Sequence, residues 1–75
     1  MTQPKRIDAT GLLCPLPVLK LAKVMKRAEV GAVVELCADD PAAVIDVPHY
    51  CTESGNTLLG TTKKVRHVIY RVQKQ

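Results

Sequence analysis

One cysteine of this 75-residue chain lies in a context that favours chemical reactivity. Cys14 is followed by Pro15 and, two residues later, by Pro17. A residue before proline is pushed out of the helical region, whereas proline itself is well accepted in the first turn of a helix. We therefore expect Cys14 to be the N-cap of a helix that begins at Pro15. The positive end of the helix dipole would there favour the thiolate, which is the nucleophilic form of the side chain.

The other two cysteines lie in less suggestive contexts. Cys37 falls inside a strongly apolar segment, so we expect it to fill the core. Cys51 follows Pro48 on a short helical segment, where it is either structural or a second thiol that resolves or accepts the group held by Cys14. No cysteine or histidine pair has the spacing of a metal site, so we expect no metal. An odd number of cysteines fits a reducing compartment, and we expect a cytoplasmic protein.

Length and composition exclude several classes of function. We expect a single domain over residues 1–75, which is too small for a doubly wound nucleotide-binding fold or a deep enclosed active site. No apolar run is long enough to cross a membrane, so we expect no membrane insertion. The formal charge of +4 points to an acidic partner. Tyr50 and Tyr70 are the only aromatic residues, which argues against specific binding of nucleic-acid bases.

The hydrophobic pattern predicts an α/β (α+β) fold with the order βαβαββ. Strands are expected at 5–9, 32–38, 57–62 and 66–72, and helices at 15–28 and 41–53. The strand at 32–38 is apolar almost throughout, which indicates a central position in the sheet. Gly31 should cap the first helix, and the second should break or kink before Pro48, with Asp46 or Val47 capping a further piece. We expect a two-layer sandwich of a four-stranded mixed sheet with both helices on one face.

This topology brings two loops together at one edge of the sheet. A right-handed strand-helix-strand unit has parallel strands, so the Cys14 loop and the Asp39-Asp40 loop should be neighbours. A carboxylate near Cys14 opposes thiolate formation. We expect one aspartate to cap the second helix before Pro41, and the other to tune the sulfur or contact partners. The alternative is that both serve only as caps.

The first helix is also strongly basic. Its charged residues are Lys20, Lys23, Lys26 and Arg27. They form either a solvated face or a docking surface for an acidic partner beside the sulfur.

The segment from Asp8 to Pro17 resembles the CPxP signature of the TusA/SirA-like sulfur carriers, the UPF0033 type. The matching motif residues are Gly11, Cys14, Pro15 and Pro17. Further matches to the second helix, the following turn and the third strand are Asp39-Asp40-Pro41-Ala42, Asp46-Val47-Pro48 with Cys51, Gly55-Asn56 and Leu58-Leu59. The resemblance covers nearly the whole chain.

The resemblance implies a small sulfurtransferase in which Cys14 carries sulfane sulfur as a persulfide, without another cofactor. It implies transfer by relay rather than self-sufficient turnover. The implied donor is a cysteine desulfurase or a rhodanese-type protein, and the implied acceptor is a DsrE-like or other sulfur-accepting protein. The end point would be tRNA wobble-uridine 2-thiolation or related sulfur metabolism. Leu16 stands where the tRNA-thiolation branch often has an acidic residue. A carrier that visits several partners is expected to be a monomer.

Two other interpretations remain open at this point. One is a regulatory or nucleic-acid-binding module that uses the basic helix together with Lys63, Lys64, Arg66 and Arg71. The other is a structural adaptor whose cysteine is inert.

Overall fold

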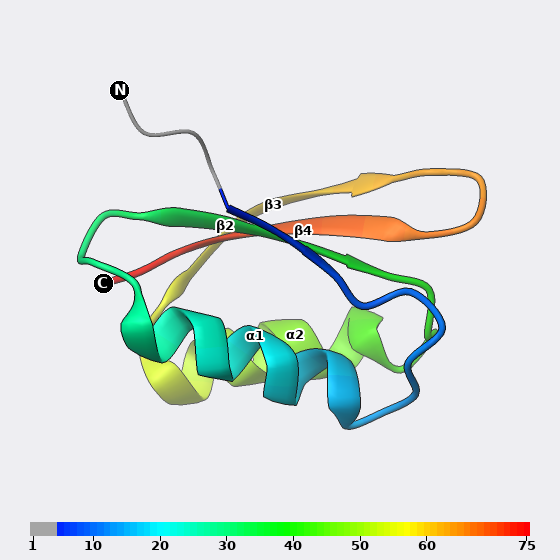
Figure 1. Ribbon diagram of the computed structural model, residues 1–75, viewed down its shortest axis with the longest axis horizontal. Helices are drawn as coiled ribbons and strands as arrows, with labels where there is room; N and C mark the ends of the chain where they lie inside the picture. The colour runs from blue at the N-terminus through cyan, green and yellow to red at the C-terminus, as the bar shows by residue number, and fades with distance from the viewer. Residues whose placement is uncertain (1–4) are drawn as a thin grey trace.

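The computed structural model describes residues 5–75, so the first four residues of the expected domain lie outside the description. The chain forms the expected βαβαββ order (Figure 1). Its elements are β1 (Lys5–Asp8), α1 (Leu16–Arg27), β2 (Val33–Ala38), α2 (Ala43–Ser54), β3 (Thr57–Lys63) and β4 (Val68–Gln73). Within this range no helix has the length and apolarity needed to cross a bilayer.

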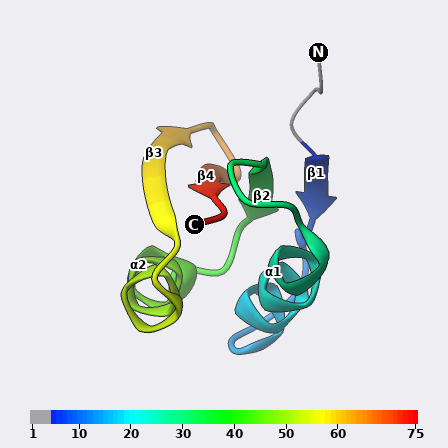
Figure 2. The ribbon, with the colours of Figure 1, turned by 90° about the vertical axis from the view of Figure 1, so that its left-hand side faces the viewer.

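The strands form one mixed sheet in the order β1-β2-β4-β3. β1 and β2 are parallel, and β4 is antiparallel to both β2 and β3. Both helices cover one face of the sheet, α1 beneath β1 and β2 and α2 beneath β3 and β4 (Figure 2). The predicted two-layer sandwich is therefore confirmed.

The core lies between the helices and this face of the sheet. Leu21 and Met25 of α1 are one helical turn apart and fully buried. They meet the strand residues Leu36, Tyr70 and Val72, which are also buried. Such burial is the dominant favourable contribution to the stability of a small domain.

β2 is a central strand, as predicted, with β1 on one side and β4 on the other. Side chains alternate between the two faces of a strand, so Leu36 faces the helices and Cys37 faces away from them. Cys37 is in register with Asp8 and Ile69 and is 9% exposed. It is buried, as expected, but on the face of the sheet opposite the helices, outside the helix-side core cluster.

Helix α1 is shorter at both ends than expected. Its N-cap is Pro15, with φ −98° and ψ 16°, so the first helical residue is Leu16 and Cys14 precedes the cap. The Cys14–Pro15 peptide bond is cis. At the other end Ala28 is the C-cap rather than Gly31, whose φ of +90° instead turns the chain toward β2.

Helix α2 runs without interruption through Pro48, so the expected break before this residue is wrong. Proline removes one helical hydrogen bond, here the bond to the carbonyl of Val44. Ala43, Val47 and Cys51 recur at four-residue spacing and are all buried against the sheet. Their packing keeps the helix continuous because tertiary contacts, more than propensity, stabilise helices in proteins. Gly55 ends the helix with φ +80°.

Candidate sulfur-transfer site

The loop that follows β1 and the loop that follows β2 leave the sheet at the same edge, as predicted (Figure 1). The turn after β1 is closed by Asp8, whose Oδ1 accepts bonds from the Thr10 N–H at 3.0 Å and the Thr10 hydroxyl at 2.6 Å. These bonds hold the pKa of Asp8 below its usual range. Gly11 has φ +81°, a conformation that glycine adopts at little cost. This turn sends the chain down from the sheet toward the start of α1.

Two carboxylates from the loop after β2 hold the backbone of the Cys14 loop. The N–H of Gly11 donates to both oxygens of Asp39, at 3.0 and 3.1 Å. The N–H of Cys14 donates to Oδ2 of Asp40, and Oδ1 of the same carboxylate accepts from the N–H of Ala42 at 3.1 Å. The N-cap of α2 is Ala42, which has no side-chain cap, so the expectation that an aspartate caps this helix is wrong. Asp40 instead closes the turn before α2 and anchors the backbone of the cysteine. The alternative that both aspartates serve only as caps is wrong, because each bonds to the neighbouring loop.

Cys14 is exposed, and its thiol contacts a third carboxylate. The Sγ–H donates to Oδ2 of Asp46, with 2.7 Å between sulfur and oxygen. Asp46 lies in the first turn of α2, one residue before the buried Val47. That position turns it toward α1 rather than toward bulk solvent, and it is half-buried.

The carboxylates oppose the effect that was expected from the helix dipole. The hydrogen bond to Asp46 raises the pKa of the Cys14 thiol above its usual range, and partial loss of water around the sulfur adds to this. The charges of Asp46 and Asp40 act in the same direction. The free thiol of Cys14 is therefore protonated at neutral pH, which corrects the expectation of a stabilised thiolate.

Asp46 is the residue of this site that the sequence pattern did not reveal. The pattern predicts Asp46 as a cap for a second helical piece, and the family resemblance includes it without assigning it a contact with Cys14. The signal that points to it is periodicity: with Ala43, Val47 and Cys51 buried, residue 46 lies at the border of the packed face. This periodicity places Asp46 at the border only if the helix continues through Pro48, as it does in the structure.

Cys51 does not join the site. Its side chain is 4% exposed in the core between α2 and the sheet, and this burial raises the pKa of its thiol. The placement favours the structural interpretation over a second reactive thiol. Within residues 5–75, no group of three or more histidine, cysteine, aspartate or glutamate side chains is arranged to hold a metal ion.

The basic residues of α1 divide into different environments. Lys20 Nζ donates to the carbonyl of Asp8 at 2.9 Å, which ties the helix to the end of β1. Lys23 and Arg27 are exposed and line a groove at the other end of the helix. Lys26 is also exposed but lies outside that groove.

The second basic cluster is dispersed. Lys63, Lys64 and Arg66 belong to the end and loop of the β3-β4 hairpin. Arg71 lies in the middle of β4, opposite Gly60. It is three residues, or about 10 Å, farther along the strand than Val68, the partner of Lys63. Tyr70 is buried in the core, so it offers no surface for base stacking. The arrangement does not favour a nucleic-acid interface.

Comparison with known proteins assigns this chain to a family. The family model described as "Sulfurtransferase TusA" matches residues 5–74. The sulfur carrier protein TusA of Pseudomonas entomophila is 36% identical over 69 residues, which are 92% of this chain and 86% of that protein. A protein of Archaeoglobus fulgidus is 44% identical over 55 residues, 73% of this chain and 71% of its own length.

A solved structure agrees with both the fold and the family. The crystal structure of a SirA-like protein from Desulfitobacterium hafniense superposes with a TM-score of 0.76 at 26% identity. The superposition covers 91% of this chain and 92% of that one. The chain belongs to the sulfurtransferase TusA family.

Proposed function

We propose that this protein is a sulfur carrier in which Cys14 receives sulfane sulfur as a persulfide and delivers it to an acceptor protein. The observation that carries the proposal is the exposed Cys14 thiol, anchored through its backbone by Asp40 and hydrogen-bonded through Sγ to Asp46. An exposed nucleophile beside a carboxylate base is suited to exchange with a partner. Membership of the TusA family supports the same reaction.

Asp46 supplies the base that the transfer requires. In the loading step, Cys14 Sγ attacks the outer sulfur of a donor persulfide, and its proton passes to Asp46 across the 2.7 Å hydrogen bond. A sulfur–sulfur bond forms at Cys14 as the donor's sulfur–sulfur bond breaks. The donor leaves as a thiolate and takes the proton. The exchange needs no oxidant or reductant because the sulfane sulfur keeps its oxidation state.

Unloading reverses the same exchange. A thiolate of the acceptor attacks the sulfane sulfur, and Cys14 leaves as a thiolate that is reprotonated within hydrogen-bonding reach of Asp46. The raised pKa of Cys14 matters for the loading step, in which Cys14 is the nucleophile. Thiols of higher pKa are intrinsically stronger nucleophiles once a base removes the proton. Between transfers the protonated thiol is protected from unspecific reaction.

The surface around Cys14 supports docking by other proteins. Leu13 and Leu16 flank the cysteine in the chain and are 69% and 49% exposed. Val44 and Ile45, beside Asp46, are 58% and 74% exposed. Large exposed apolar side chains grouped around a reactive atom are typical of an interaction site. We propose a cysteine desulfurase or a rhodanese-type protein as donor and a DsrE-like protein as acceptor, with tRNA wobble-uridine thiolation as one end point.

Intact-mass analysis after incubation with a cysteine desulfurase and free cysteine tests this proposal. The wild-type protein should gain the mass of one sulfur atom, and dithiothreitol should remove it. Cys14→Ser should gain nothing, whereas Cys37→Ala, which removes a different thiol, should be loaded like the wild type. Sulfur found only on Cys51, or equal loading of Cys14→Ser, would show that Cys14 is not the carrier.

A further inference from the structure

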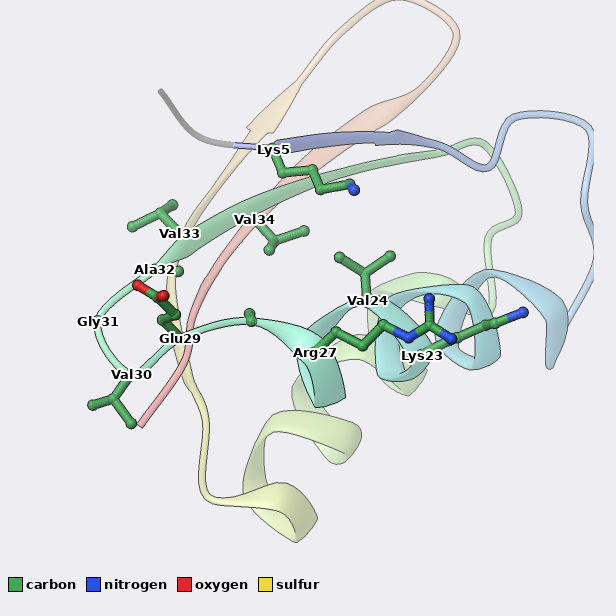
Figure 3. A pocket seen from close by; sticks show the side chains of 11 residues that line it. Lys5, Lys23, Val24, Arg27, Glu29, Val30, Gly31, Ala32, Val33 and Val34 are labelled. Carbon is green, nitrogen blue, oxygen red and sulfur yellow. The ribbon is translucent and has the colours of Figure 1, made fainter. Parts of the chain in front are cut away.

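A groove of about 810 Å³ lies at the end of α1 that is distant from Cys14 (Figure 3). Its walls are the last two turns of α1 and the first residues of β1 and β2, and the turn between α1 and β2 closes one end. Helix α1 has 12 residues and is therefore about 18 Å long. An occupant of this groove would leave the sulfur accessible.

Three basic side chains surround the groove. Lys5 belongs to β1, whereas Lys23 and Arg27 lie one turn apart on α1. Figure 3 shows the charged end of Lys5 directed from the strand toward the helix that carries the other two. Within the described residues none of these three takes part in an ion pair. Glu29, in the turn after the helix, is the single acidic residue among the described residues that line the groove.

The floor of the groove is apolar. Val24 of α1 is half-buried and Val34 of β2 is buried, and the two face each other between the layers (Figure 3). Ala28 continues this surface, and Val30 adds a side chain that is 78% exposed at the rim. An apolar floor with a basic rim complements a chain segment that carries both apolar and acidic side chains.

The edge of the sheet next to the groove favours recognition through side chains. β1 is an edge strand whose Ala9 N–H bonds to Cys37, so the alternate residues Arg6 and Asp8 turn their backbone groups outward. Lys20 already occupies the outward carbonyl of Asp8. Lysine side chains on a short edge strand discourage addition of another strand. Extension of the sheet at this edge is therefore disfavoured.

We propose that the groove lined by Lys5, Lys23 and Arg27 docks an extended acidic segment of a protein partner in the sulfur relay. Carboxylates of the segment lie at the three cations, and its apolar side chains cover the half-exposed Val24 and Ala28. This docking rests on the proposed carrier function. It tethers the partner while Cys14 exchanges sulfur, which raises the effective concentration of the two reacting groups. Nucleic acid fits less well because the lining residues that the structure describes include no aromatic side chain for base stacking.

Titration of the full-length protein with a fluorescein-labelled peptide of alternating glutamate and leucine tests this inference by fluorescence anisotropy. The double variant Lys23→Glu/Arg27→Glu should bind about tenfold more weakly, since it replaces two attractions by repulsions. Lys26→Glu is the matched control: it reverses a charge on the same helix outside the groove and should bind like the wild type within about twofold. A peptide of alternating glutamate and serine should also bind more weakly, because it keeps the charge and loses the apolar contacts.

Backbone amide shifts of the labelled protein locate the bound peptide. Changes centred on Val24, Ala28 and Val34 support the groove. No binding, an equal loss in Lys26→Glu, or tighter binding of oligouridylate at the same residues would overturn the proposal. Sulfur loading of Cys14, measured in parallel by mass, separates the two hypotheses. Normal loading without peptide binding rejects the groove alone, whereas absent loading with peptide binding rejects the carrier function.

Discussion

At the scale of single residues, the site combines an exposed cysteine with carboxylates that hold it as a thiol. Asp40 and Asp39 bond to the backbone of the Cys14 loop, while Asp46 alone receives the thiol hydrogen. A helix N-terminus next to a thiol usually favours the thiolate by about 0.3–1 kcal/mol at an exposed position. Here a direct hydrogen bond and two negative charges outweigh that contribution, and the pKa of Cys14 is raised.

Replacement of Asp46 by asparagine should separate the two roles that this residue has. The pKa of Cys14 should fall toward its usual value, because the charged acceptor and its negative potential are both removed. Alkylation by iodoacetamide should then reach half its maximal rate at a lower pH than in the wild type. Sulfur loading from a donor persulfide should instead become about tenfold slower or worse, since the base is lost.

Glu53→Gln provides the control for this experiment, because it neutralises an exposed carboxylate on the same helix without contact to Cys14. Its pH profile should coincide with that of the wild type. An unchanged profile in Asp46→Asn would contradict the assigned hydrogen bond.

At the scale of elements, α2 both supplies Asp46 and retains an internal proline. Residues Ala43, Val47 and Cys51 bind the helix to the sheet on either side of Pro48. Continuity matters for the site because Asp46 lies on the turn that precedes the proline. A break at this point would free the first turn of α2 and with it the carboxylate at Cys14.

Substitution of Pro48 by alanine should stabilise the protein. It restores a donor for the carbonyl of Val44 and removes a residue that is disfavoured in helix interiors. The free energy of unfolding should therefore rise by about 1–3 kcal/mol. Urea denaturation followed by circular dichroism measures the change. Pro41→Ala, in the turn before the helix, should change stability by less than about 1 kcal/mol. A loss of stability in Pro48→Ala would show that the proline is required for packing.

At the scale of the whole molecule, the two ends of α1 have different surfaces. Apolar side chains surround Cys14 at one end, and a basic groove lies at the other. The molecule measures 29 × 26 × 18 Å, so a protein partner is large enough to reach both. This arrangement suits a small carrier that must present its sulfur and still be recognised.

Leu13→Ser should reveal whether the apolar surface near Cys14 serves docking rather than chemistry. Sulfur transfer from a protein donor should slow by about fivefold or more, because a central apolar contact is lost. Alkylation by iodoacetamide should be unchanged, since a small reagent needs no docking surface. Leu59→Ser, at an exposed position on β3, is the control and should leave both rates unaltered. Equal slowing of both reactions in Leu13→Ser would indicate a disturbed Cys14 loop instead.

The sequence by itself determined the order of the elements and the central position of β2, and it singled out Cys14 as the candidate carrier residue. These features depend on local information: hydrophobic periodicity identifies strands and helices, and two prolines mark the start of a helix. The neighbouring positions of the Cys14 and Asp39-Asp40 loops followed from the handedness of strand-helix-strand units. The observed strand bounds differ from the expected ones by one or two residues because turns extend into the expected strands. One example is the turn closed by the hydrogen bond from the Lys64 N–H to the His67 carbonyl, which delays the start of β4 to Val68.

Only the tertiary structure decided the protonation state of the cysteine and the surfaces around it. Cys14 and Asp46 are 32 residues apart, and their contact depends on how α1 and α2 lie against each other. Strand register and helix packing likewise determine which face of the sheet Cys37 occupies. They also bring Lys5, Lys23 and Arg27 to the same groove. Local patterns specify what each segment becomes, whereas the electrostatics of a site depend on distances between segments, and packing alone determines those distances.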